Sequence, residues 1–285
     1  MIETVCPDYL GESASFYETA PVIAAQGYFH GYYSYEITRD LARGVPQTRA
    51  CFAENGLIPC GFRLPVDISA PCAVFEAGMQ SLEQVVQAAA QTGYRSALTW
   101  IMPGSEEFEV MIYHAVLVYR LRRFAALLAN YQMDLAVEMV APYTLQAAYR
   151  YPAPCRMEHL LRLLHEVDRN NVGIVLDAFH FYCAGHRDAA YGRLPGTCRI
   201  MMAHLSDGVP NRIPQQQCDL ERRLPGTTGV VPCGPFFDCL KASGYTGGVV
   251  PEPLGHALDG MSFEEKLRCA AKSMQRVWPK PEDNR

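Results

Sequence analysis

The sequence has no apolar run that approaches the roughly 18 residues needed to cross a bilayer. Its first residues, Met1 to Cys6, lack the basic and apolar regions of a secretory signal peptide. We therefore expect a cytoplasmic protein with no membrane partner. No low-complexity segment or linker divides the 285 residues, so we expect one domain that spans residues 1–285.

Three further features that would indicate a function class are missing. The eleven cysteines form no Cys-x-x-Cys pair and are odd in number, which fits neither a zinc knuckle nor a disulfide framework. The 25 Lys and Arg residues against 30 Asp and Glu form no basic block, so we expect no nucleic-acid partner. No G-x-G-x-x-G follows a predicted strand, which removes support for a dinucleotide site.

What the sequence does contain is an alternation of short apolar runs with longer amphipathic stretches. The clearest predicted strands are 96–102, 135–140, 172–177, 199–204 and 248–252, and weaker ones lie near 3–9, 28–36 and 58–68. Helical spacing of apolar residues recurs at 81–93, 111–131, 159–167, 236–244 and 262–278. Eight strands that alternate with helices in a chain of this length predict an α/β protein, a single (β/α)₈ TIM barrel.

Four of the predicted strands carry a metal-competent side chain at or near their carboxyl ends: Glu138, Asp177, His204 and Glu252. A single Asp in such a position is more often a helix N-cap or an ion-pair partner. In a barrel, however, the ends of successive strands meet at one rim, so these four become neighbours. Carboxylates in apolar surroundings are costly to bury without compensation, and a divalent cation compensates several at once. Three oxygen donors and one imidazole suit Mn²⁺, Mg²⁺ or Co²⁺ better than a thiolate-rich zinc site does.

At this point the sequence resembles the xylose-isomerase-like TIM-barrel superfamily of sugar isomerases and epimerases. Its members include tagatose and psicose 3-epimerases, hydroxypyruvate isomerase and 3-dehydroshikimate dehydratases. The resemblance covers residues 134–255 and rests most on Asp177-x-x-His180 and on His204-x-x-Asp207-Gly208. It implies that Glu138, Asp177, His204 and Glu252 bind one divalent metal ion. Mn²⁺ is the ion we expect, with Mg²⁺, Co²⁺ or Zn²⁺ as alternatives.

The resemblance also implies a function and further site residues. We expect an isomerase or epimerase of a small sugar, keto-sugar or polyol that works through an enediolate, with Glu138, Glu252 and His180 as catalytic residues. Arg223 or Arg212 is the expected substrate-binding arginine, and Asp207 is expected near the substrate. Trp100, near the end of the fourth strand, is a candidate aromatic contact for a sugar.

Several alternatives remain open from the sequence alone. A lyase or dehydratase of the same fold, acting on a 3-dehydroshikimate-like or 3-keto-glycoside substrate, would use the same residues. The dehydratase is less favoured because Val140 stands where several relatives place a basic residue. Two further alternatives are an apurinic-site endonuclease and a non-catalytic metal-binding barrel. The net negative charge of the chain disfavours the endonuclease. We expect a carbohydrate as the small-molecule partner, and a homodimer or homotetramer as the assembly.

Overall fold

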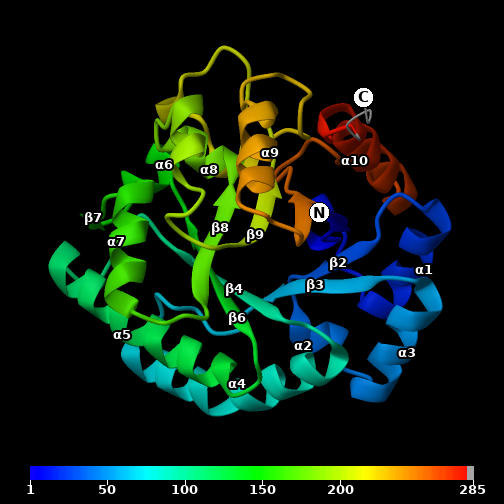
Figure 1. Cartoon of the computed structure of the whole chain (residues 1–285), viewed down its shortest axis with the longest axis horizontal. Coiled ribbons are helices and arrows are strands. Elements are labelled where there is room, and N and C mark those ends of the chain that lie inside the picture. Colours follow the sequence, from blue (N-terminus) through cyan, green and yellow to red (C-terminus); the bar gives the residue numbers. More distant parts are fainter. Residues whose placement is uncertain (281–285) are drawn as a thin grey trace.

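Eight parallel strands form a closed barrel at the centre of the molecule, and helices surround it (Figure 1). The computed structural model describes residues 1–280. Around the barrel the strands follow the order β1-β10-β9-β8-β6-β4-β3-β2. They are β1 Ile2–Val5, β2 Gly31–Ser34, β3 Ile58–Arg63, β4 Ser96–Ile101, β6 Asp134–Met139, β8 Val172–Asp177, β9 Ile200–Leu205 and β10 Gly248–Pro251.

The helices connect these strands and pack on the outer surface of the barrel. They are α1 Phe16–Gln26, α2 Ile37–Asp40, α3 Val45–Asn55, α4 Cys72–Thr92, α5 Val110–Ala129, α6 Tyr143–Gln146, α7 Met157–Val167, α8 Ala178–Cys183, α9 Cys233–Ala242 and α10 Phe263–Val277. Short 3₁₀ turns at Asp8–Leu10, Asp188–Arg193, Pro214–Gln216 and Asp219–Glu221 complete the connections. Among residues 1–280, no helix combines the length and apolar character that a membrane crossing requires.

Alternation along the strands explains how one barrel holds both a dry core and a polar rim. Side chains two positions apart point to the same face of a strand. The apolar residues that point into the barrel form their own buried cluster, which includes Leu98, Ala136, Val175 and Val250. Two residues further along each of these strands come Trp100, Glu138, Asp177 and Glu252. The apolar cluster therefore forms a floor, and the polar residues stand one layer above it.

The predicted fold class is confirmed, and all eight predicted strands are present in the barrel. The helices α1 and α3 were not predicted. Helix α1 contains Pro21, and α3 has little apolar periodicity, with polar residues through much of its length. A small antiparallel sheet of β5 (Gly104–Ser105) and β7 (Tyr151–Pro152) was also not predicted, because strands of two residues carry no alternation pattern.

Candidate metal centre

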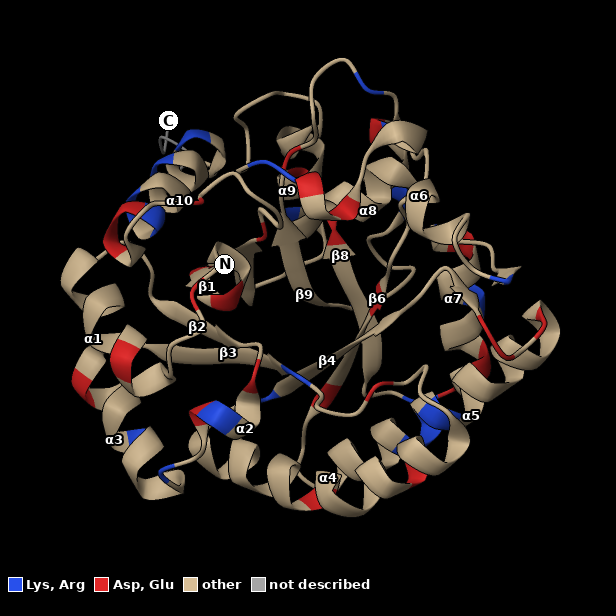
Figure 2. Ribbon diagram, turned by 180° about the vertical axis from the view of Figure 1, so that it is seen from behind, with Lys and Arg blue, Asp and Glu red and all other residues tan. Residues whose placement is uncertain are grey.

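The structure brings Glu138, Asp177, His204 and Glu252 together at the carboxyl end of the barrel. One ligand atom from each of the four lies within 4.8 Å of the others, and all four side chains are buried. Strand register produces this convergence, because Asp177 on β8 pairs with His204 on β9, and Glu252 follows directly after β10. In Figure 2 an acidic segment marks the end of β8, inside the ring of helices.

His204 is oriented so that one edge of its ring faces the carboxylates. Its Nδ1 atom lies 3.0 Å from Glu138 Oε1 and 3.4 Å from Glu252 Oε2. The rings of Tyr9 and Tyr33 meet the imidazole edge to face. Burial alone would lower the pKa of His204, but the charges of Glu252 and Glu138 outweigh it and raise the pKa to about 10. The site therefore favours positive charge at the point where the four residues meet.

Asp177 serves the site and the adjacent helix at once. Its Oδ1 atom accepts the backbone N–H of His180 at 2.8 Å, so Asp177 is the N-cap of α8. This cap fixes His180 three residues later, with its Nδ1 atom accepting the N–H of Ala141 at 3.3 Å. The other ring nitrogen, Nε2, lies 3.0 Å from Arg222 Nη2, and a guanidinium nitrogen can only donate. The N–H groups of Ala141 and Arg222 therefore compete for the unprotonated nitrogen of the His180 ring.

Arg222 is a fully buried arginine that contacts the carboxylates of this site. Its Nη1 atom donates to Asp177 Oδ2 at 3.0 Å and to Glu252 Oε2 at 2.7 Å. Its Nη2 atom donates to Asp219 Oδ1 at 2.7 Å and lies 3.0 Å from His180 Nε2. Burial works to raise the pKa of Asp177 and of Asp219, but the Arg222 guanidinium holds both below their usual range. Arg222 thus joins three carboxylates and the His180 ring in one buried network.

The residues present fit a divalent cation. Three carboxylates and one imidazole converge in a buried volume, and Arg222 bonds two of these carboxylates. His204 Nε2 is also buried without a hydrogen-bond partner. Burial raises the pKa of Glu252, and the neighbouring charge of Glu138 acts in the same direction, although Arg222 and His204 oppose it. A bound cation would offset this excess of negative charge, so the group is suited to one metal ion.

A cavity of about 450 Å³ opens over these residues. That volume lies within the range of roughly 300–1,000 Å³ that is typical of small-molecule sites. The lining combines acidic, basic and aromatic side chains. Its residues are Asp8, Tyr9, Tyr35, Trp100, Met102, Glu138, Val140, His180, Asp219, Leu220, Arg222, Glu252 and Leu254.

The structure places two other predicted site residues, Trp100 and Asp207, in different surroundings. Trp100 lines the cavity and stacks with Tyr35, with ring centroids 6.2 Å apart. Asp207 is completely buried and does not line the cavity. Its carboxylate accepts five backbone N–H groups, those of Gly208, Thr228, Gly229, Val230 and Val231. Asp207 thus holds the loop that precedes α9.

Arg212 and Arg223, the predicted substrate-binding arginines, lie outside the cavity lining, and Arg222 lines it instead. Arg212 forms an ion pair with Glu221. The backbones of Arg223 and Asp207 exchange two hydrogen bonds of 2.8 Å, which places residue 223 in an extended bridge. Neighbouring side chains of extended backbone point to opposite faces, so a shift of one residue moves the arginine from the site to the outer side.

Besides Arg222, four polar or aromatic residues of the cavity lining were not among the predicted site residues: Asp8, Tyr9, Tyr35 and Asp219. Asp8 and Tyr9 follow β1, and Tyr35 follows β2, so each comes just after a barrel strand. These two strands have only four residues each, and their weak pattern hid the position of their ends. A search for polar residues behind the weaker strands would have found Asp8.

Comparisons with known proteins agree with this architecture. A family model described as xylose isomerase-like TIM barrel matches residues 25–276. No curated protein matches the chain. A xylose isomerase domain protein from Alicyclobacillus acidocaldarius has a similar structure, with a TM-score of 0.85 and 24% identity over 97% of this chain and 98% of that one.

Two further solved structures share the fold. The IolI protein, solved with a zinc atom, has a TM-score of 0.80 and 16% identity, over 97% of this chain and 98% of that one. A D-psicose 3-epimerase solved in the presence of D-fructose has a TM-score of 0.74 and 18% identity, over 97% of this chain and 99% of that one. At these identities the likeness establishes the fold.

Proposed function

This chain belongs to the xylose isomerase-like TIM barrel family, and we propose that it is a divalent-metal-dependent isomerase or epimerase of a small sugar or keto-sugar. One observation carries the proposal: three carboxylates and an imidazole converge at the floor of a cavity, beside His180 and Arg222. The similarity in fold to a D-psicose 3-epimerase supports the same reaction class.

We propose that Glu138, Asp177, His204 and Glu252 hold the metal, and that Mn²⁺ is the ion, with Mg²⁺, Co²⁺ and Zn²⁺ as competitors. The oxygen-rich donor set supports this choice, and the zinc atom in the similar IolI structure supports a divalent ion. When bound, such an ion supplies Lewis-acid polarisation of a substrate carbonyl.

The protein groups then have separate tasks in an enediolate reaction. Glu138 and Glu252, which both approach Nδ1 of His204, would remove a proton beside the carbonyl and return it. Burial raises the pKa of Glu252, and a raised pKa makes its carboxylate a stronger base. His180 and Arg222, whose Nε2 and Nη2 atoms lie 3.0 Å apart, would contact the oxygen on which negative charge develops, and the positive charge of Arg222 would stabilise it. Trp100 and Tyr35 would cover the apolar face of the sugar.

Incubation of the Mn²⁺-loaded protein with ketohexoses in D₂O tests the proposal. Deuterium that enters at a carbon beside the carbonyl, with recovery of an isomeric sugar, is the expected result. Loss of water or of an aglycone without an isomeric product would instead identify a lyase. Absence of both exchange and product from any ketose or 3-keto-sugar would contradict the proposal.

A further inference from the structure

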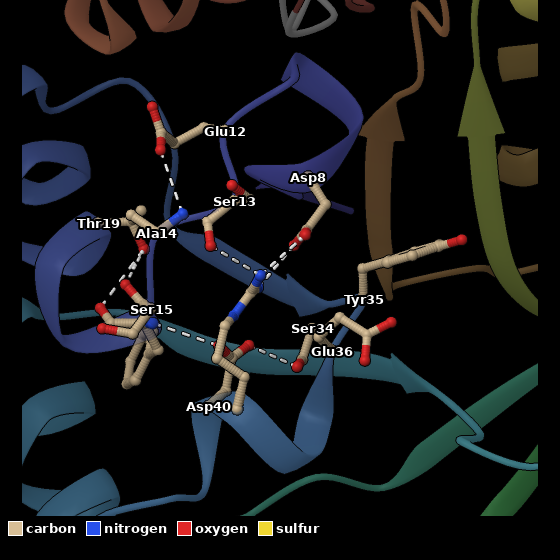
Figure 3. A network of polar contacts seen from close by, with 12 residues as sticks. Asp8, Glu12, Ser13, Ala14, Ser15, Thr19, Ser34, Tyr35, Glu36 and Asp40 are labelled. Atoms are coloured by element: carbon tan, nitrogen blue, oxygen red, sulfur yellow. Dashed lines mark hydrogen bonds and ion pairs between the residues drawn. The ribbon is translucent and has the colours of Figure 1, made fainter.

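Asp8 is a carboxylate from the N-terminal half of the chain that lines the cavity above the metal centre. It opens the 3₁₀ turn Asp8–Leu10, which follows β1, and its side chain is only 14% exposed. Figure 3 shows Asp8 across from Tyr35, the aromatic residue that stacks with Trp100. Asp8 therefore borders the space that a substrate would occupy.

Arg39 fixes the position of this carboxylate. Its Nη1 and Nη2 atoms donate to the two oxygens of Asp8 at 3.0 and 2.7 Å, in a bidentate pair. Its Nε atom donates to Asp40 Oδ1 at 3.2 Å, and its Nη1 atom also donates to the carbonyl of Ser13. Asp40 in turn accepts hydrogen bonds from Tyr32 and from Ser34. Figure 3 shows the bond from Ser34. A network of this kind serves to orient Asp8, because each member restricts the next.

The charges around the cavity are strongly unbalanced. Four carboxylates line it, those of Asp8, Glu138, Asp219 and Glu252, and Asp177 lies beside them. Arg222 is the one Lys or Arg in the lining within residues 1–280, and it already bonds three of these carboxylates. Arg39 bonds Asp8 from outside the lining, so five carboxylates face two guanidinium groups, and a divalent ion would still leave an excess of one negative charge. A substrate phosphate or carboxylate would find no unpaired cation here.

The other basic side chain near the cavity, Arg63, does not change this balance. It lies against the Tyr35 and Trp100 rings, outside the cavity lining. Its guanidinium is paired with Glu36 and donates to the carbonyl of Tyr35. Arg63 therefore supports the aromatic wall and is neutralised there.

We propose that Asp8, oriented by Arg39, is a specificity-determining residue that selects an uncharged polyhydroxy substrate and excludes phosphorylated and carboxylated sugars. Each Asp8 oxygen keeps a lone pair that can accept a substrate hydroxyl, and the carboxylate repels an anion at the same position. This inference rests on the proposed function, since it assigns the substrate class of the same site.

Direct binding tests this inference without turnover. The Mn²⁺-loaded protein is titrated calorimetrically with D-fructose, D-tagatose and D-psicose, each beside its 6-phosphate, at up to about 100 mM, well above ordinary KM values. We expect at least one neutral sugar to bind about tenfold or more tightly than its phosphate. Asp8→Asn keeps the shape of the side chain, removes its charge and frees Arg39, so it should reduce that preference by about tenfold or more.

Glu12→Gln is the matched control, because it removes one charge from the same segment at a residue outside the cavity lining. It should leave the preference unchanged. Three results would overturn the inference: the phosphate binds as tightly as the sugar, Asp8→Asn keeps the wild-type preference, or no neutral sugar binds. Asp8→Ser provides the same comparison if the Asn variant does not fold. Deuterium exchange with an acidic sugar would support the proposed function and overturn this inference. Binding of a neutral sugar without deuterium exchange would support this inference and contradict the proposed function.

Discussion

Replacement of Arg222 by Met tests how the buried charges of the site are balanced. Arg222 donates to Asp177, Glu252 and Asp219, and its side chain is 2% exposed. Removal of one partner from a buried ion pair typically costs about 3–5 kcal/mol, because the remaining charges lose their compensation. For a chain of this size, roughly 2–4 °C of melting temperature corresponds to each kcal/mol. We therefore expect metal-free Arg222→Met to melt at least about 6 °C below the wild type.

Bound metal should reduce the destabilisation that Arg222→Met causes. A divalent ion offsets Asp177 and Glu252 whether or not Arg222 is present, so the destabilisation should fall by about half or more in saturating Mn²⁺. By thermodynamic linkage, the variant should then bind Mn²⁺ more tightly than the wild type. Urea unfolding with EDTA and with Mn²⁺, together with calorimetric titration of the ion, measures both quantities.

Arg223→Met is the control, because it changes the adjacent arginine, whose side chain does not line the cavity. Its effect on stability and on metal affinity should be less than about 1 kcal/mol. Equal destabilisation by Arg222→Met with and without metal would refute the reasoning. So would a larger effect at Arg223 than at Arg222.

Three other predictions follow from the same geometry. Glu138→Gln should lower kcat by about 10²–10⁴-fold in the deuterium-exchange assay, since general acid–base catalysis contributes about that much, and unchanged exchange would contradict the role of Glu138. In the metal-free protein, burial works to lower the pKa of His204, but the carboxylates raise it from 6.5 to about 10. The folded state therefore holds a proton that the unfolded chain releases. The contribution of His204 to stability should be complete below pH 6.5 and lost as the pH rises toward 10, and His204→Asn should remove this part of the pH dependence of urea unfolding. Asp207→Ala leaves five backbone N–H groups without their acceptor and should cost about 3 kcal/mol or more in urea unfolding, whereas a loss below about 1 kcal/mol would mean that the loop is held by other contacts.

The sequence predicted the barrel and its convergent carboxylates because the relevant strands are long and apolar. In β6, β8 and β9 a run of apolar residues predicts the strand, and a polar residue near the end of the run indicates the position of the barrel rim. The convergence then follows from topology alone, because all parallel strands of a barrel end at the same rim.

The remaining part of the site depended on details that the sequence pattern does not encode. The choice between Arg222 and Arg223 is a question of which face an extended segment presents, and that is set by the bridge to Asp207, about fifteen residues earlier in the chain. Asp8 and Tyr35 follow strands of only four residues, whose pattern is too short to locate their ends. The role of Asp207 as an acceptor for five N–H groups depends on how the loop folds back over it.

The most direct test of the account is the stoichiometry of metal binding to the wild type and to variants of the four convergent residues. The account predicts one Mn²⁺ per chain by calorimetry and elemental analysis, and a loss of affinity of at least about tenfold in Asp177→Asn and in His204→Asn. Asp134→Asn, at the opposite end of β6 and paired with Arg199, should bind the ion as the wild type does. Absence of a bound divalent ion, or equal affinity in all four proteins, would contradict the central claim.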